Sequence, residues 1–264
     1  MSAAPITAVD DYVEFCAGVR GLCEVDLSQY KRTQMERRIR SFAVRRGAPR
    51  LADYLRRLAS DVEELDRLLD RVTINVSQLW RNPAQWTLLQ HDVLPALAQT
   101  ERIRAWSAGS SYGAEAYTLA AVARAAVPTV TTTVLGTDID RRMVALAQVG
   151  EFSDNDARDA PPDALERWFV RTATGWRAGE ELRAVTSFER ADLLRLTPRP
   201  HAYDLILCRN TAIYFNEDVR DKLHTALAEA LRPGGYLLVG STERVADPTT
   251  IDLSPVLPFT YRKS

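Results

Sequence analysis

Apolar residues near the start of the chain recur at the three- and four-residue spacing of an amphipathic helix. In the segment 29–46, Met35, Ile39 and Phe42 fall on one face, and Gly47 ends the run. The pattern predicts a helix whose arginine-rich side faces solvent.

The neighbouring segments have the same period. Asp10 can cap the N-terminus of a helix that precedes this segment. The apolar positions of 51–58 predict another helix after it. Asp61 and Glu64 have the spacing of a capping box ahead of a leucine-rich run. We therefore expect residues 1–72 to form a helical domain.

From about residue 100 the pattern changes to short apolar or β-branched runs that alternate with helical ones. Such alternation favours an α/β domain with a mostly parallel sheet and crossover helices, and we assign it to 73–264. The Asp-rich stretch 153–164 predicts a loop, and we expect a small β-subdomain within 150–190, with one hairpin over 170–177. The predicted strands are 103–107, 131–136, 188–192, 203–208, 236–240 and 259–262, and the predicted helices are 114–126, 141–148 and 218–231.

Composition excludes several classes of protein. The chain has 264 residues, 46% apolar and 26% charged, so it can bury a core and is not a disordered chain. Its 34 basic and 35 acidic residues leave a net charge of −1, which disfavours a globally basic nucleic-acid binder. Three cysteines without a CxxC argue against a disulfide framework or zinc ribbon and suit the cytoplasm, and the three histidines lack metal-ligand spacing. We expect no metal, no signal peptide and no membrane insertion.

Charge is unevenly distributed along the chain. Between positions 20 and 58 there are eleven Arg or Lys residues and four acidic ones, a local balance of +7. Such a basic region in a near-neutral protein suggests an acidic partner that docks there. A solvated arginine-rich surface accounts for the same count, so the charge pattern alone leaves both interpretations open.

Polar residues follow several predicted strands at the edge where α/β sheets bind ligands. Gly109 follows the first strand and lets the backbone approach a ligand. Asp138 follows the second, 25 residues past Gly113, where an acid can bind both hydroxyls of a ribose. We assign the N-cap of the next helix to Asp140 and leave Asp138 for the ligand.

The later strand ends extend this pattern. Asp192 and Leu193 offer an acceptor and an apolar side chain that suit an adenine ring. Cys208, Arg209 and Asn210 place polar groups at the end of a buried strand, which is costly unless they are paired or functional. Together with the Arg-Pro-Gly-Gly turn that precedes the strand at 236–240, these features resemble class I S-adenosylmethionine-dependent methyltransferases.

Further motifs narrow the resemblance. The block 75–81, Asn-Val-Ser-Gln-Leu-Trp-Arg, is similar to the Asn-x-Thr-x-Phe-Phe-Arg signature of the chemotaxis receptor methyltransferases, the CheR family. The segment 106–117 resembles that family's Trp-Ser-Ala-Gly-x-Ser-x-Gly-x-Glu-x-Tyr motif, and 208–215 its Cys-Arg-Asn-x-x-Ile-Tyr-Phe motif. Residues 240–243 match a late Gly-x-x-Glu turn, and 30–42 and 54–72 are similar to its N-terminal helical domain.

The resemblance implies a class I, Rossmann-like fold with a small N-terminal all-α domain. It also implies methyl transfer from S-adenosylmethionine to glutamate side chains on the cytoplasmic helices of chemoreceptors, with S-adenosylhomocysteine as product. The active-site tyrosine falls on Tyr214, and Arg81 is the second candidate catalytic group. The predicted cofactor-binding residues are Asn75, Ser77, Arg81, Gly109, Glu115, Asp138, Asp192, Leu193, Cys208, Arg209 and Asn210.

In this family the basic N-terminal helices are thought to meet the receptor's acidic methylation helices. The resemblance therefore favours docking at the basic region, with Arg37, Arg38, Arg40 and Arg45 as candidate contacts. We expect a cytoplasmic monomer that binds neither nucleic acid nor metal. Whether the subdomain within 150–190 binds a receptor's tethering peptide stays open.

The chain departs from the family pattern at Leu79, Ala114, Ala116 and Asp192, and these changes can alter the shape of the substrate pocket. Three alternatives therefore remain. The same fold can methylate another protein or a small molecule, with the N-terminal helices as a lid. It can also serve as a cofactor-binding signalling module without turnover. A nicotinamide-dependent oxidoreductase is disfavoured because no GxGxxG is present.

Overall fold

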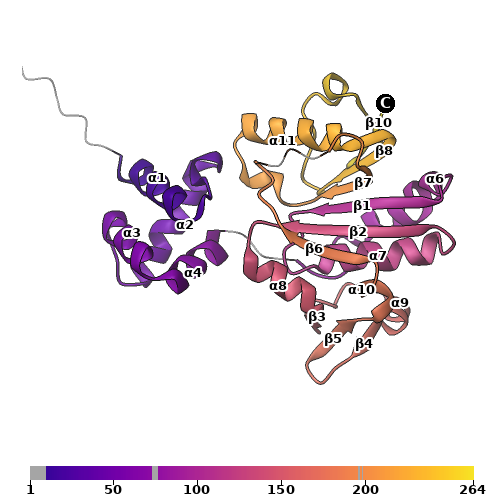
Figure 1. Cartoon of the computed structure of the whole chain (residues 1–264), viewed down its shortest axis with the longest axis horizontal. Helices are drawn as coiled ribbons and strands as arrows, with labels where there is room; N and C mark the ends of the chain where they lie inside the picture. Colours follow the sequence, from indigo (N-terminus) through magenta and orange to yellow (C-terminus); the bar gives the residue numbers. More distant parts are fainter. Residues whose placement is uncertain (1–9, 73–76, 196, 198) are drawn as a thin grey trace, which may run out of the picture. The chain divides into compact units, whose positions relative to one another are not determined.

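The computed structural model describes residues 10–72, 77–195, 197 and 199–264 (Figure 1). The chain divides into two compact units. One comprises residues 1–74 together with the short segment Tyr214–Asn216, and the other comprises Asn75–Ile213 and Glu217–Ser264. We call them the helical unit and the sheet unit.

The helical unit confirms the predicted helices. Its elements are α1 (Asp11–Cys23), η1 (Leu27–Gln29), α2 (Arg32–Arg45), α3 (Leu51–Ser60) and α4 (Val62–Val72). The Asp10 carboxylate accepts a hydrogen bond from Tyr12 N and caps α1 as predicted. Helix α2 begins later than predicted because residues 27–29 form a separate 3-10 turn.

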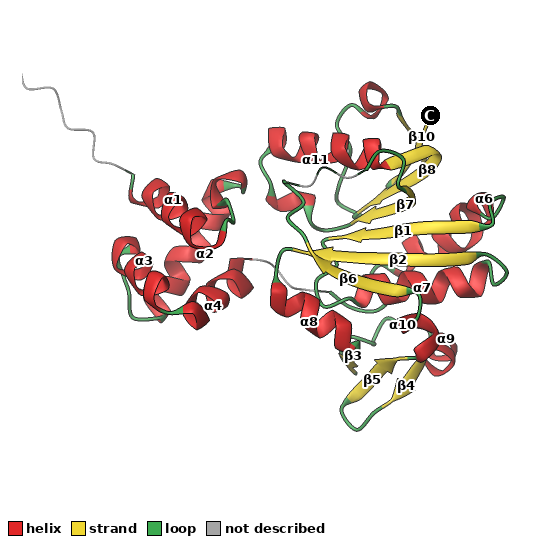
Figure 2. Cartoon of the chain, in the orientation of Figure 1, coloured by secondary structure: helices red, strands yellow, loops and turns green. Residues whose placement is uncertain are grey.

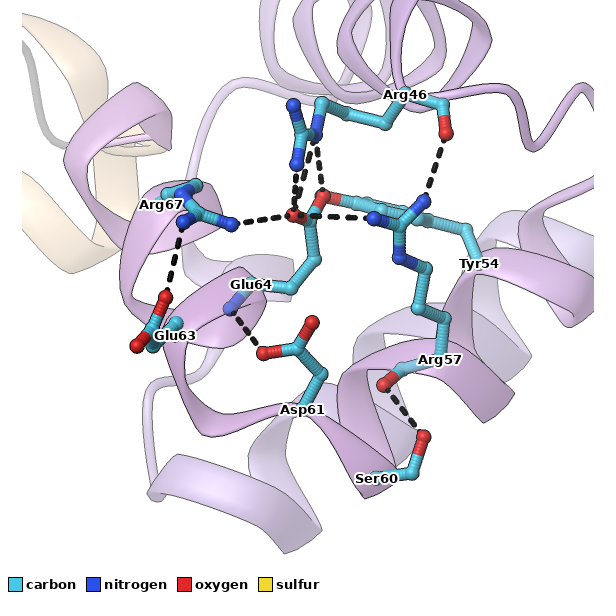
Figure 3. A network of polar contacts seen from close by, with 8 residues as sticks. All are labelled: Arg46, Tyr54, Arg57, Ser60, Asp61, Glu63, Glu64 and Arg67. Carbon is cyan, nitrogen blue, oxygen red and sulfur yellow. Dashed lines mark hydrogen bonds and ion pairs between the residues drawn. The ribbon is translucent and has the colours of Figure 1, made fainter.

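The predicted capping box before α4 is only half present. Asp61 Oδ1 accepts from Glu64 N at 3.0 Å, as an N-cap should. The Glu64 carboxylate does not return to the backbone of Asp61 and instead accepts hydrogen bonds from Arg46, Tyr54 and Arg67 (Figure 3). The Glu64 side chain is fully buried, and the Arg46 guanidinium above all holds its pKa at about 2. We call Glu64 with Arg46, Tyr54, Arg57 and Arg67 the Glu64 cluster.

The sheet unit contains a seven-stranded sheet in the order β6-β2-β1-β7-β8-β10-β9 (Figure 2). The first five strands in this order are parallel, and β10 pairs antiparallel with both β8 and β9. This confirms the predicted mostly parallel α/β fold. Six of the strands coincide with predicted ones, but β8 begins at Leu231, so the Arg-Pro-Gly-Gly segment predicted as a turn lies within it. Strand β9 was not predicted. The bounds are β1 (Arg102–Ala108), β2 (Thr131–Asp138), β6 (Thr186–Arg190), β7 (Tyr203–Cys208), β8 (Leu231–Val239), β9 (Leu253–Leu257) and β10 (Thr260–Lys263).

Helices cover the sheet because their apolar faces need burial. Helix α7 is alanine-rich and packs on β1, β2 and β6, where small side chains allow close approach. The predicted bounds of α7 and β7 are confirmed, those of α8 differ by one residue at its end, and those of α11 differ by one residue at both ends. The crossover and flanking helices are α5 (Pro83–Leu88), the π-helical turn η2 (Leu89–Val93), α6 (Leu94–Leu97), α7 (Ala114–Ala126), α8 (Arg141–Val149), α11 (Glu217–Ala230) and the 3-10 turns η3 (Ala212–Tyr214) and η4 (Pro248–Ile251).

A second, three-stranded antiparallel sheet lies between α8 and β6 in the chain. Its order is β3-β5-β4, with β3 (Glu151–Ser153), β4 (Phe169–Arg171) and β5 (Gly175–Ala178). The expected hairpin is therefore present, with one further strand. Helices α9 (Pro162–Trp168) and α10 (Glu180–Arg183) flank it. Among the described helices, none combines the length and apolar character needed to cross a membrane.

Candidate active site

The strand order of the large sheet reverses between β1 and β7. From β1 the chain proceeds outward to β2 and β6, whereas from β7 it proceeds in the other direction to β8. Ligands of open α/β sheets bind beyond the carboxyl ends of the strands at such a switch point. The segments after Ala108 and Cys208 therefore line the candidate site.

The loop after β1 presents unpartnered polar groups. Gly109 has a left-handed backbone (φ 79°), and a Cβ there would collide with the Thr211 side chain. The side-chain hydroxyls of Ser110 and Ser111 are buried and have no hydrogen-bond partner among the residues that the structure describes. Because a buried hydroxyl is costly to leave unpaired, these two fit a ligand that supplies polar groups here.

Asp138 ends β2 with the arrangement expected of a ribose acceptor. Its side chain is buried, one carboxylate oxygen accepts from Ser111 N at 2.8 Å and the other from Asp140 N at 3.0 Å. Burial raises the pKa of Asp138, and these two backbone donors oppose that change. Each oxygen keeps a lone pair for a ligand hydroxyl. The N-cap of α8 is Asp140, as predicted, since it accepts from Arg142 N and Met143 N.

Arg209 forms the centre of a buried polar network at the end of β7. Its Nη1 donates to Glu115 at 3.0 Å, its Nε to Gln85 at 2.9 Å and its Nη2 to the Arg81 carbonyl at 2.6 Å. Glu115 also accepts from Ser107 Oγ at 2.8 Å. The guanidinium thus ties β7 to the segment 81–85 and to α7.

This network adds a structural role to the expectation for Arg209. Its side chain holds the segments around the site together, and its contact with a cofactor stays a prediction. Sequence reasoning missed Gln85, which also donates to the Val239 carbonyl at 2.9 Å. It also gave no role to Ser107, although Ser107 lies within the motif at 106–117, whereas Gln85 lies in none of the motifs.

The remaining strand-end residues differ in exposure. Asp192 is half-buried and accepts from Leu194 N at 2.9 Å, while Leu193 is buried. The Cys208 side chain is fully buried, and burial raises the pKa of its thiol well above the ordinary value. A thiol in this environment stays protonated, which argues against a nucleophilic role for Cys208.

The block that precedes α5 contributes two described candidates. Arg81 is half-buried, and its carbonyl accepts from both Arg209 and Trp86. The Ser77 carbonyl accepts from the Tyr112 hydroxyl. Asn75, the third candidate, lies outside the described residues.

Tyr214 and the two residues after it belong by their contacts to the helical unit. The Tyr214 carbonyl accepts from Lys31 N at 2.9 Å, and Asn216 N donates to the Gln29 carbonyl at 2.9 Å. The rings of Tyr30 and Phe215 meet edge to face at 5.0 Å. These contacts hold the backbone of Tyr214, the candidate catalytic tyrosine, to the helical unit.

The four candidate docking arginines on α2 are not equivalent. Arg37 and Arg45 are exposed, and Arg45 bonds only locally, to Ser41 Oγ. Arg40 pairs with Asp11 and Glu36, and Arg38 is half-buried and donates to the Val72 carbonyl at 3.2 Å. Arg37 and Arg45 are thus the better placed for a partner. In the part of the chain that the structure describes, no group of acidic, His or Cys side chains could hold a metal ion.

Comparisons with known proteins match both units. The family described as "CheR methyltransferase, SAM binding domain" matches residues 75–256, and "CheR methyltransferase, all-alpha domain" matches 10–73. A chemotaxis protein methyltransferase of Listeria monocytogenes is 33% identical over 96% of this chain and 97% of its own length. Chemotaxis protein methyltransferase 1 of Vibrio cholerae is 28% identical over 88% of each chain.

Proposed function

Since this chain belongs to the CheR methyltransferase family and is a methyltransferase that uses S-adenosylmethionine, we propose that it methylates glutamate side chains on chemoreceptors. The products are a glutamate methyl ester and S-adenosylhomocysteine. The observation that carries the cofactor side of the proposal is Asp138, buried near two serine hydroxyls that lack a partner among the described residues. The family match supports the glutamate acceptor.

The cofactor supplies an electrophilic methyl group on a sulfonium cation. Asp138 is suited to accept the ribose hydroxyls, and Asp192 with Leu193 to meet the adenine ring. The Arg209 network holds the segment that bears Arg81. These assignments give the chain a recognition group for the ribose and one for the adenine of the cofactor.

The acceptor needs no general base. A glutamate carboxylate has a reference pKa of about 4.3 and is ionised at neutral pH. The oxygen–methyl bond forms as the methyl–sulfur bond breaks, and both charges disappear. The protein must therefore orient the carboxylate and exclude water rather than remove a proton.

Arg81 and Tyr214 are the groups we assign to this orientation. Arg81 balances charge near the donor or holds the carboxylate's second oxygen, and the Tyr214 hydroxyl orients the acceptor. A bidentate arginine on the attacking oxygen would weaken it as a nucleophile, which favours a lesser contact. Arg37 and Arg45 supply exposed positive charge for an acidic receptor helix in the cytoplasm.

Tyr214→Phe tests the assignment. The variant should lower kcat for methyl transfer by about tenfold or more while the Kd for S-adenosylhomocysteine stays within about threefold, because only the acceptor contact is removed. Steady-state kinetics and titration calorimetry give the two numbers. An equal loss in both would contradict the role of Tyr214.

A further inference from the structure

Glu243 lies in the turn after β8 and is nearly as buried as the core, with 5% of its surface exposed. Its carboxylate accepts three backbone hydrogen bonds, from Gly240 N at 2.6 Å, Asn210 N at 2.7 Å and Ile213 N at 3.1 Å. Among the described residues, all three of these donors to the carboxylate are backbone amides. Burial raises the pKa of Glu243, whereas these three donors lower it because they stabilise the ionised carboxylate.

Two of the three donors belong to the loop after β7. Strands β7 and β8 are parallel neighbours, with Cys208 opposite Val239, so the turns that follow them lie at one edge of the sheet. Glu243 joins the two turns through Asn210 and Ile213. It therefore closes the loop 209–213 onto the sheet.

The local backbone is shaped for this contact. Asn210 adopts a left-handed conformation (φ 57°), which costs a non-glycine residue energy unless its surroundings hold it. A Cβ at position 240 would collide with the Glu243 carboxylate and close on Asn210 N. Glycine at 240 is thus what allows the carboxylate to reach both turns.

We propose that Glu243 is a positioning residue for methyl transfer. It fixes the backbone of the loop 209–213, and the loop in turn sets the position from which Tyr214 continues the chain. Ile213 directly precedes Tyr214, and the Ile213 amide is bonded to Glu243 while the Tyr214 carbonyl is bonded to Lys31 N. Glu243 therefore holds the residue from which Tyr214 continues the chain. A shift of about 1 Å in a group that orients a substrate can cost about 100-fold in rate.

The proposal rests on the proposed function of Tyr214, and a double-variant cycle tests the link. Glu243→Gln keeps the size of the side chain but replaces one acceptor oxygen by an N–H₂ group that faces a backbone donor. We expect kcat to fall about 10- to 100-fold, with the Kd for S-adenosylhomocysteine within about threefold. Adding Tyr214→Phe to Glu243→Gln should slow transfer by no more than about twofold beyond the slower single variant.

Two companion variants separate positioning from general damage. Glu243→Asp keeps the charge on a shorter side chain and should recover part of the rate, and it serves as the test variant if Glu243→Gln does not fold. Thr242→Ala changes an exposed neighbour in the same turn and should transfer methyl groups at the wild-type rate. Tryptophan fluorescence confirms that each variant is folded before its kinetics are compared.

Hydrogen exchange of the full chain gives a readout that needs no turnover. Peptides that contain the amides of Asn210 and Ile213 should exchange faster in Glu243→Gln than in the wild type. If the wild-type chain methylates no glutamate, the proposed function fails. Faster exchange in Glu243→Gln would still support the part of the proposal in which Glu243 holds the loop 209–213. Unchanged exchange, an unchanged kcat, or rate losses that multiply with Tyr214→Phe would overturn the proposal.

Discussion

Glu64→Gln is the substitution whose effect on the helical unit follows most directly from the structure. The Glu64 side chain has 0% exposure, and three guanidinium groups lie within 3.7 Å of its carboxylate, those of Arg46, Arg57 and Arg67 (Figure 3). Glutamine keeps the size and loses the charge. Three arginines are then left around a neutral group, and the Tyr54 hydroxyl keeps at most a weaker acceptor.

The size of the effect follows from the pKa of Glu64, which lies at about 2 against an ordinary value of 4.5. At about 1.4 kcal/mol per pKa unit this corresponds to about 3 kcal/mol. The arginines are 33% to 46% exposed, so solvent screens part of the attraction. We expect Glu64→Gln to destabilise the helical unit by about 2 kcal/mol at pH 7.

The pH dependence has a definite sign. Because the folded-state pKa is depressed, the charge of Glu64 contributes its full stabilisation above the unfolded-state pKa of about 4.5. The contribution decreases as the pH falls from there through about 2. The difference in stability between wild type and Glu64→Gln should therefore be full at pH 7 and much smaller near pH 3.

Hydrogen exchange of the full chain separates this effect from changes elsewhere. All five tryptophans lie between positions 80 and 176, so their fluorescence reports on the sheet unit, while exchange of peptides from 46–72 reports on the helical unit. Glu63→Gln is the matched control, because Glu63 is 83% exposed and its pair with Arg67 is worth below about 0.5 kcal/mol. Equal losses for Glu63→Gln and Glu64→Gln, or a loss for Glu64→Gln that is unchanged at pH 3, would refute the reasoning.

Two further predictions concern the sheet unit. Asp138→Asn should raise the Kd for S-adenosylhomocysteine by about 10- to 100-fold, because a charged acceptor contributes roughly 1.5–3 kcal/mol to a hydrogen bond; a Kd within twofold of wild type by calorimetry would remove Asp138 from the cofactor site. Iodoacetamide at pH 8 should leave Cys208 unmodified in the folded chain, because its thiol is fully buried with a raised pKa, whereas half-buried Cys23 should react faster. Mass mapping of the alkylated peptides measures both labelling rates. Rapid labelling of Cys208 would contradict this prediction, because it would mean that the end of β7 opens to solvent.

The elements that sequence predicted best are those whose signals are local. The alanine-rich helix α7 and the buried strand β7 have uninterrupted patterns, and their bounds were predicted to the residue. Strand β9 was missed because it is short and Pro255 interrupts its apolar pattern. A proline is tolerated there because β9 is an edge strand, and the pairing with β10, which the local sequence does not signal, makes it a strand.

The residues of the candidate site also divide into those with a local signal in the sequence and those whose partners are distant in it. Asp138 and Asp140 could be told apart from their places at a strand end and a helix start, and the structure gives Asp140 the cap. Gln85 could not be found, because its two partners, Arg209 and Val239, are distant in the sequence. Glu64 was predicted to cap its own helix, but arginines from other helices compete more strongly for its charge.

The central claim is methyl transfer to glutamate carboxylates, and one measurement tests it most directly. The chain is incubated with methyl-labelled S-adenosylmethionine and the cytoplasmic fragment of a chemoreceptor from the same organism, and methanol released by base is counted. Base-labile label on the fragment, absent from a fragment whose methylated glutamates are replaced by alanine, is the predicted result. A cofactor that binds at micromolar Kd without any base-labile label on the receptor would contradict the claim.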